Sequence, residues 1–454
     1  MIEKYQSRRQ LLKMKGKGLM VFILITLLLI PSAVGASSNK GEVIYKTTKQ
    51  LTLEPVIKNN KIYVRLDPLI NGLGASYTIY PNTKAIEIKY KNTTFSIEGD
   101  ILKINGYPHL VKLPPEYIGG EALLPIQYIT ELFNIDPQYD PINSKITLVN
   151  EEKTFNERYS VKIDNRTINA MDFKIRSIED NFWGSLFLDE QLKYDKETIL
   201  SFTQKYKIKS SYEPKDFSPY YWLHDLRQTL IYAKINGVQD VKPVIDHLID
   251  YMHHFIVVKG NKAFVSYPFN HRVYNKEYEK GWSSALGNGL SLWGYVYAYK
   301  ITGEQKYKDM ADKLANSLLD IRDDDDNRWI TFADENKFLW FEEAPNKLEP
   351  QTRILNGHIS SIEALYAYNQ ISPNKRVLDT IKAAITTVYY YIDSYRIPNN
   401  IHAYALYDKA IPDYGQIRNL NQLENLYEIS GDPYFLFMRG SFENDYRRSG
   451  KEIN

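Results

Sequence analysis

The pattern of apolar and polar positions changes near residue 215. Before that point, apolar residues alternate with polar ones in short runs, which is typical of strands that bury one face. After it, apolar residues recur at three- and four-residue spacing, which predicts amphipathic helices. We therefore predict a multidomain α+β chain, with a β-rich N-terminal part and a helical C-terminal part.

Residues 43–150 contain an internal repeat. The first copy covers about 60–88 and the second about 120–148, and each reads as an alternating strand, a short amphipathic helix, a turn and a further strand. This repeat predicts a β-rich module over 43–150. Residues 151–210 are predicted to form a small β-containing region that connects it to the helical part.

Four helical segments follow, and each is broken by a turn: 226–255, 290–319, 360–392 and 423–437. Glycine at such a break supplies the left-handed residue after a helix. Hairpins of helices that recur about every 65 residues are typical of repeat architectures. We predict an α/α toroid, an incomplete barrel of helical hairpins, over 211–454, with its connecting loops around a central cleft.

The N-terminus predicts an export signal over 1–36. Five basic residues lie within residues 8–17 and precede an apolar stretch over 19–30. Val34 and Ala36 then supply small residues at positions −3 and −1 of a cleavage site. The mature chain would begin near Ser37 and work as a secreted or cell-surface protein; an uncleaved anchor is the alternative.

Composition removes several function classes. The chain has no cysteine, which excludes disulfides and thiolate metal sites, and its net charge of +2 gives no electrostatic case for nucleic-acid binding. The 37 tyrosines suit sugar binding, although tyrosine also fills layers between packed helices. The acidic run 323–326 could bind Ca²⁺ but lacks the EF-hand pattern, so a solvated turn is favoured. We expect no cofactor and no metal.

Three blocks carry the candidate chemistry: 281–289, 340–345 and 354–358. Each mixes aromatic, small and polar residues at the end of a helical pattern, which suits a pocket for a flat-faced polar ligand better than a core. With Leu406-Tyr407-Asp408, these blocks resemble the C-terminal domain of the D-glucuronyl C5-epimerase family over roughly 210–440. The resemblance implies inversion at C5 of uronic acid residues within a polysaccharide.

Residues 43–150 resemble the N-terminal, stalk-like domain of copper amine oxidases. They contain a single histidine, His109, so we expect no copper site and interpret the module as a spacer or wall-facing domain. The partner that the two resemblances imply is an acidic, uronate-containing polysaccharide, with the cell wall as a further candidate. The epimerase resemblance also admits a homodimer.

C5 epimerisation needs acid/base groups on opposite faces of the sugar and neutralisation of its carboxylate. The family phrase Trp-Tyr-Glu-Glu-Tyr-Pro implicates its second glutamate, which corresponds to Glu343. Here Phe341 and Ala344 replace the two tyrosines. Tyr407 matches a family tyrosine, and Tyr414 lies near the expected opposing tyrosine, without the histidines that follow it in the family.

The remaining candidates are substrate-binding residues. Arg418 could hold a carboxylate, His358 a hydroxyl, and Asn356 could cap a helix that favours an anion, or serve as a cap alone. The full substrate-binding set is Glu342, Trp340, Trp282, Asn288, Asn356, His358, Arg418 and Tyr267, with Trp282, Trp340 and Tyr267 as stacking platforms. A polysaccharide lyase and a non-catalytic glycan-binding or wall module remain alternatives.

Overall fold

The computed structural model describes residues 43–450, with gaps. The gaps are 59–60, 91–92, 100, 105–106, 111–113, 134, 136, 141–142, 156–158, 178–191, 274–275, 324–327, 347–349, 398, 408 and 410–415. The predicted export signal, Tyr414, Asp408 and most of the acidic run 323–326 therefore lie outside the described residues. None of the described helices combines the length and apolar character that a membrane span needs.

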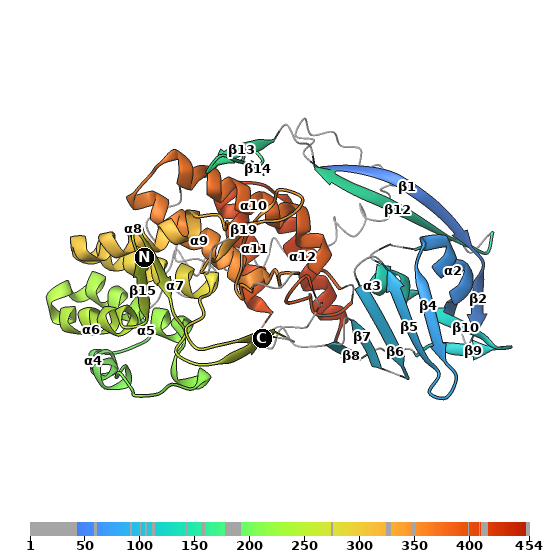
Figure 1. The fold of residues 1–454 in the computed structure, drawn as a ribbon, viewed down its shortest axis with the longest axis horizontal. Helices are drawn as coiled ribbons and strands as arrows, with labels where there is room; N and C mark the ends of the chain where they lie inside the picture. The colour runs from blue at the N-terminus through green and yellow to red at the C-terminus, as the bar shows by residue number, and fades with distance from the viewer. Residues whose placement is uncertain are drawn as a thin grey trace, which may run out of the picture.

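The N-terminal part is β-rich, as predicted, and forms the right-hand side of Figure 1. Its described strands build sheets in the orders β2-β3-β10-β9, β4-β5-β6-β7-β8 and β1-β12-β11. The strands are β1 (Val43–Leu53), β2 (Pro55–Lys58), β3 (Lys61–Arg65), β4 (Ser76–Tyr80), β5 (Ala85–Tyr90), β6 (Thr93–Glu98), β7 (Ile101–Ile104), β8 (Tyr107–Leu110), β9 (Glu116–Ile118), β10 (Glu121–Pro125), β11 (Gln138–Asp140) and β12 (Lys145–Phe155).

Two helices cover these sheets, α2 (Leu66–Leu73) and α3 (Gln127–Phe133). Each follows a strand and precedes a strand pair, so both predicted copies have the order strand, helix, strand, strand. The two leading strands, β3 and β10, pair antiparallel in one sheet, with Val64 opposite Leu124. Both side chains are fully buried in the core of this module.

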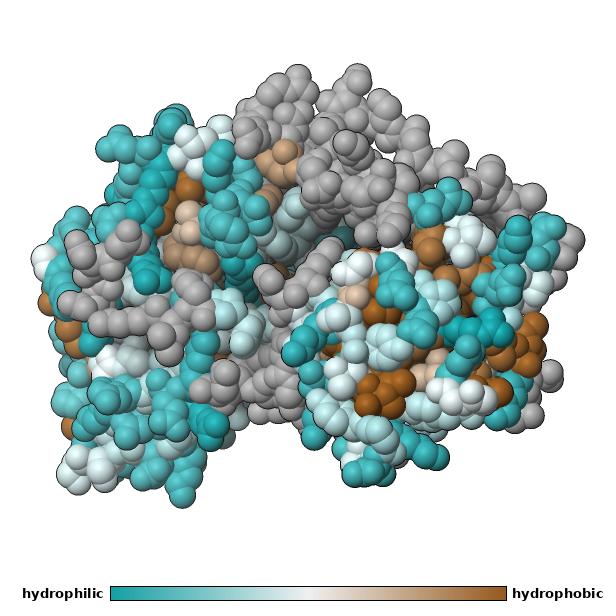
Figure 2. All heavy atoms as spheres, turned by 45° about the vertical axis from the view of Figure 1, so that its right-hand side comes forward, coloured by the Kyte–Doolittle hydropathy of each residue, from teal (hydrophilic) through white to brown (hydrophobic). Residues whose placement is uncertain are grey.

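A long ribbon connects the two parts of the chain. Strands β1 and β12 pair antiparallel from Leu53, opposite Ile146, to Val43, opposite Phe155 (Figure 1). At the end of the ribbon, the Phe155 ring contacts that of Phe338 in the helical part, with centroids 5.4 Å apart. Figure 2 shows hydrophobic side chains on the surface of the β-rich module, where Ile57 is 57% exposed.

The connecting region is only partly β. Strands β13 (Ser160–Ile163) and β14 (Arg166–Asn169) form a hairpin with Asp164 and Asn165 at its turn. Both turn residues have positive φ, 46° and 63°, as a two-residue hairpin turn requires. Helix α4 (Lys196–Lys205) follows, which the expectation of a β-containing region did not include.

The C-terminal part is helical, as predicted, and its described helices pair as successive hairpins. They are α5 (Pro219–Asn236), α6 (Lys242–His253), α7 (Ala285–Thr302), α8 (Gln305–Leu319), α9 (Leu355–Ile371), α10 (Lys375–Tyr395), α11 (Ile417–Ser430) and α12 (Tyr434–Arg448). Gly303 and Gly431 end α7 and α11 in the left-handed conformation, with φ of 73° and 72°. Gly237, at the first break, instead has φ 109° and ψ 139°.

The first helix of each hairpin packs against the first helix of the next. Glycines on α7 allow close approach: a Cβ at Gly289 would lie 3.1 Å from the Ser361 Cα, and one at Gly294 would lie 2.5 Å from the Trp222 ring. Lys300, near the end of α7, contacts Gln370 near the end of α9, so these two helices run parallel. The prediction that the hairpins close into a toroid stays a prediction.

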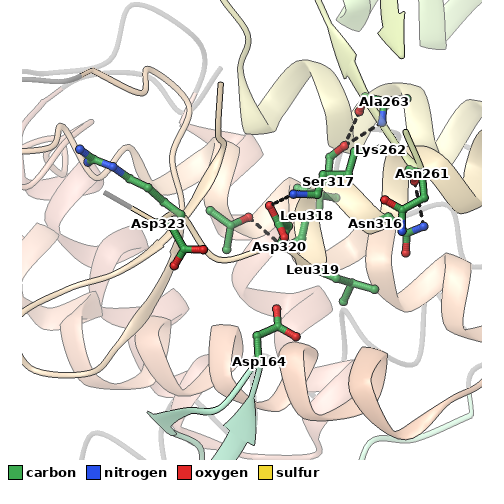
Figure 3. Close-up of polar contacts among 12 residues, drawn as sticks. Asp164, Asn261, Lys262, Ala263, Asn316, Ser317, Leu318, Leu319, Asp320 and Asp323 are labelled. Atoms are coloured by element: carbon green, nitrogen blue, oxygen red, sulfur yellow. Dashed lines mark hydrogen bonds and ion pairs between the residues drawn. The ribbon is translucent and has the colours of Figure 1, made fainter. Parts of the chain in front are cut away.

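Short hairpins precede α7 and α9. They are β15 (Ile256–Lys259) with β16 (Lys262–Val265), β17 (His271–Val273) with β18 (Lys276–Tyr278), and β19 (Thr331–Ala333) with β20 (Leu339–Phe341). Figure 3 shows how α8 holds the first of them: the Ser317 hydroxyl contacts both the backbone N–H and the carbonyl of Ala263, at 3.0 and 2.5 Å. Lys262 pairs with Asp320 beside this contact.

Candidate functional site

Glu342 and Glu343 directly follow strand β20, where the chain passes the N-terminal ends of helices α7 and α9. The Glu342 backbone N–H donates to Ile330 at 2.8 Å, and its carbonyl accepts from the N–H of Ala285, the first residue of α7, at 3.0 Å. These bonds place the pair at the N-terminal end of α7. Trp340 and Phe341, which precede the pair, form the end of strand β20.

The Glu342 carboxylate holds the following loop together. It is fully buried and accepts hydrogen bonds from the Thr352 hydroxyl, from the Arg353 N–H at 3.0 Å and from the Ala344 N–H at 3.1 Å. Burial raises the pKa of Glu342, and these donors act against that rise. Glu342 therefore serves the loop between β20 and α9, rather than a ligand.

The Glu343 carboxylate points to other partners. Its Oε1 accepts a 2.9 Å hydrogen bond from the Tyr404 hydroxyl, and its Oε2 is buried beside Gly357, in the first turn of α9. Burial raises the pKa of Glu343 to about 7, with the charge of Glu342 adding to the rise. The Tyr404 bond, the charge of Arg418 and the Gly357 amide lower that pKa.

Tyr404 was not predicted from the sequence. Its segment pairs with the start of α9 through a bridge between Ala405 and Ile354 and a 3.1 Å bond from the Leu355 N–H to the Tyr404 carbonyl. This pairing brings a residue 61 positions away onto Glu343. The sequence feature that could have pointed to Tyr404 is the small residue on each side of it, Ala403 and Ala405. Both alanines are fully buried.

Of the predicted acid/base tyrosines, only Tyr407 lies in the described part of the chain. Its backbone N–H reaches the Thr352 carbonyl at 3.5 Å, and the Lys276 ammonium lies 5.8 Å from the centre of its ring. Tyr407 therefore lies on the same loop contact as Tyr404, beside the first residue of β18.

Arg418 lies in the first turn of α11, close enough to Glu343 for its charge to lower the Glu343 pKa. Its guanidinium stacks 4.6 Å above the ring of Tyr220, in the first turn of α5. The neighbouring Tyr221 is 65% exposed, which makes it an open aromatic face that the sequence analysis did not single out. Arg418 therefore connects the first turn of α5, in the first hairpin, and the first turn of α11, in the last hairpin, to the site around Glu343.

Of the three predicted stacking platforms, Trp340 and Tyr267 are buried and Trp282 is half-buried. Trp340 is 1% exposed and donates its indole N–H to Asp334 at 3.0 Å. The rings of Tyr267, at 4.1 Å, and His271, at 5.6 Å, both stack nearly parallel on Trp282. The stacking expectation is corrected for Trp340 and Tyr267, because packing takes the faces that a sugar would need.

Two predicted polar contacts are structural. Both His358 ring nitrogens bond the backbone, Nδ1 to the Phe341 N–H at 2.9 Å and Nε2 to the Ala384 carbonyl at 3.1 Å. Burial lowers the pKa of His358 to about 4, so the ring is neutral. Asn288, also fully buried, bonds the Val265 N–H and the Ala263 carbonyl, each at 2.9 Å.

Asn356 is not the helix cap that the sequence predicted. Helix α9 begins at Leu355, with Ile354 at the cap position, so Asn356 lies inside the first turn. Its backbone carbonyl accepts from Gln422 of α11 at 2.9 Å. Its side-chain Oδ1 is buried and has no partner among the described residues, which leaves it available to a ligand.

The site is therefore a carboxylate among helix N-termini. The first turns of α9 and α11 and the first residue of α7 lie beside the Glu342–Glu343 pair, through Gly357, Arg418 and Ala285, and Arg418 in turn contacts Tyr220 in the first turn of α5. Helix N-termini and an arginine favour negative charge. In the described part of the chain, no three His, Asp or Glu side chains converge as a metal site would need.

Two segments of the chain match known families. Residues 259–444 match the D-glucuronyl C5-epimerase C-terminus, and residues 43–170 match the copper amine oxidase N-terminal domain. Both matches, and their order, confirm the resemblances found in the sequence. Among curated proteins, none matches the chain.

Solved structures give distant similarities to the fold. The GH76 α-mannanase BT2949 of Bacteroides thetaiotaomicron is 13% identical, with a TM-score of 0.39 over 57% of this chain and 72% of that one. An unsaturated glucuronyl hydrolase from Streptococcus agalactiae is 13% identical, with a TM-score of 0.34 over 71% of this chain and 77% of that one. Scores this low carry no argument about function.

Proposed function

We propose that this protein is a secreted enzyme that epimerises uronic acid residues at C5 within an acidic polysaccharide. The observation that carries the proposal is the environment of the Glu343 carboxylate. This carboxylate has a pKa raised to about 7, lies beside Arg418 and the α9 N-terminus, and falls within the segment that matches the epimerase family. A carboxylate with such a pKa is poised to accept and return protons near neutral pH.

The reaction begins with removal of the proton at C5, alpha to the substrate carboxylate. Ionised Glu343 takes up that proton on one face of the sugar. Arg418 and the surrounding helix N-termini offset the negative charge that builds on the substrate carboxylate as the C5–H bond breaks. A tyrosine, Tyr414 or Tyr407, returns a proton to the opposite face, which inverts C5.

Isotope exchange at C5 tests this function directly. Mature protein, residues 37–454, is incubated in deuterated water with heparosan and with other uronate polymers, and the products are followed by NMR. We expect deuterium at C5 together with iduronate signals, and the loss of both with Glu343→Gln. An unsaturated uronate signal would make the protein a lyase instead.

A folded sample that binds a uronate polymer without any C5 exchange would overturn the enzymatic proposal. The protein would then be a glycan-binding module. The replacement of the family tyrosine by Ala344, which is 1% exposed and packed among Ile354, Ala405 and Tyr278, is the feature that would explain lost chemistry.

Export is the remaining part of the proposal. Cleavage after Ala36 would release a mature chain that begins at Ser37 and then enters the β-rich module, which we propose as the spacer between the cell surface and the helical domain. N-terminal sequencing of protein recovered from culture medium tests this. A mature N-terminus at Ser37 supports export and cleavage, whereas an intact residue 1 on membrane-bound protein would favour the anchor.

A further inference from the structure

The two carboxylate oxygens of Glu343 have different surroundings. Oε2 is buried, and a Cβ built on Gly357 would lie only 2.4 Å from it, so the first turn of α9 closes that side. Oε1 accepts a 2.9 Å hydrogen bond from the Tyr404 hydroxyl. A sugar that approaches Glu343 therefore meets the Tyr404 hydroxyl at one oxygen and the protein backbone at the other.

Tyr404 is placed to stand between the carboxylate and a ligand. It is only partly buried, and it packs at the edge of the small cluster of Ala344, Ile354, Ala405 and Tyr278. Ala344 follows Glu343 in the chain and offers no hydroxyl, so the phenol beside Glu343 comes from the neighbouring segment instead.

We propose that Tyr404 is the catalytic residue that meets the C5 proton, and that Glu343 works through it as the final proton acceptor. This inference rests on the proposed epimerase function and deepens it. Glu343 then needs no open oxygen of its own, which agrees with the closed side at Gly357.

The relay balances as a single concerted step. The C5–H bond breaks and its proton bonds to the Tyr404 phenol oxygen, while the phenol O–H bond breaks and that proton passes to Oε1 of Glu343. The electron pair of the C5–H bond moves into the substrate, which becomes enolate-like. The group on the opposite face then gives a proton to C5, and both protein groups recover their starting protonation by exchange with water.

The test measures C5–deuterium exchange on heparosan by the Tyr404→Phe variant, which keeps the ring and removes the hydroxyl. Tyr368→Phe is the matched control, because Tyr368 also donates from its hydroxyl to a carboxylate, that of Asp312 at 2.8 Å, away from the site. We expect Tyr404→Phe to lose about 10²- to 10⁴-fold in exchange rate, the range for a group that transfers a proton. Heparosan binding by both variants should stay within about threefold of wild type.

A pH profile separates proton transfer from an effect of Tyr404 on the Glu343 pKa. The Tyr404 hydrogen bond lowers the Glu343 pKa, so Tyr404→Phe raises it. If Tyr404 acts only by lowering that pKa, the variant regains its rate once the pH exceeds the new pKa. If Tyr404 relays the proton, the rate stays low at every pH at which the protein is folded.

Recovery at high pH, or a rate within about tenfold of wild type, would overturn the relay while leaving the epimerase function intact. Absence of exchange by the wild-type protein on every uronate polymer would instead overturn the proposed function. The two failures are therefore distinguished in the same experiment.

Discussion

Gly357 and Glu343 fit together with no space between them. A Cβ on Gly357 would stand 2.4 Å from the Glu343 Oε2 and 2.9 Å from its Cβ, closer than nonbonded heavy atoms approach. Gly357 lies in the first turn of α9, where its conformation is helical, so glycine is required here for space. The carboxylate consequently rests directly on the helix backbone.

Gly357→Ala should push Glu343 from its position. We expect the C5 exchange rate to fall by about 10²-fold, since small displacements of a reacting group cost that much, with folding retained. Gly440→Ala is the control, because a Cβ there meets nothing within 4 Å in helix α12. It should leave activity unchanged and stabilise the helix by about 0.5–1 kcal/mol. Equal activity of the two variants would contradict the tight contact.

The pH dependence of exchange should follow ionisation of Glu343. The carboxylate accepts a proton only when it is ionised, so the rate should rise with pH and reach half its maximum near the Glu343 pKa of about 7. Arg418→Gln removes a charge that lowers this pKa, and the midpoint should therefore move to higher pH. Rates of the wild type and the variant, measured from pH 5 to 9, check both expectations.

Arg376→Gln serves as the control for that profile, because Arg376 pairs with Asp164 on the β13–β14 hairpin and not with the site. Its midpoint should match that of wild type. A midpoint for Arg418→Gln that also matches wild type would show that Arg418 does not act on Glu343.

Glu343 should also make folding stability depend on pH. Its folded pKa, about 7, lies above the ordinary value of 4.5, so between these values the folded state holds a proton that the unfolded state has released. Stability from this group therefore falls as pH rises from about 4.5 to 7. Gln at position 343 cannot titrate, so the unfolding free energy of Glu343→Gln should rise relative to that of wild type over this range, by about 2.5 kcal/mol.

Urea unfolding of both proteins at pH 5 and pH 8 measures this difference. The comparison of the two proteins cancels the titration of every group that does not interact with Glu343. A gap in unfolding free energy that is the same at both pH values would contradict the raised pKa.

Asn288 should prove to be structural. Asn288→Ala removes both hydrogen bonds to the β16 backbone and leaves the buried Val265 N–H unpaired, while the Ala263 carbonyl keeps its bond from the Ser317 hydroxyl. We expect a loss of about 1–3 kcal/mol in unfolding free energy. Asn316→Ala, which removes an exposed bond to the Asn261 carbonyl of the same hairpin, should cost less than about 1 kcal/mol. If Asn288→Ala is as stable as wild type but no longer binds polysaccharide, Asn288 is a substrate-binding residue after all.

The sequence predicted the helical hairpins but placed their first helices late. The predicted starts at 226, 290, 360 and 423 lie five to seven residues after the observed starts at Pro219, Ala285, Leu355 and Ile417. These first turns are poor in the three- and four-residue apolar pattern, because some of their polar and small side chains face the site. Two of the candidate blocks, which we predicted at the ends of helical patterns, contain the first turns of α7 and α9.

By itself the sequence determined the two-part architecture and the two family resemblances, and it singled out Glu343 as a candidate, because periodicity and local motifs are properties of neighbouring residues. Only the tertiary structure decided which side chains face one another. It buried Trp340, stacked Tyr267 and His271 on Trp282, and tied both nitrogens of His358 to the backbone. It also brought Tyr404 onto Glu343, 61 residues away, through the bridge between Ile354 and Ala405, and this contact leaves no periodic trace in the chain.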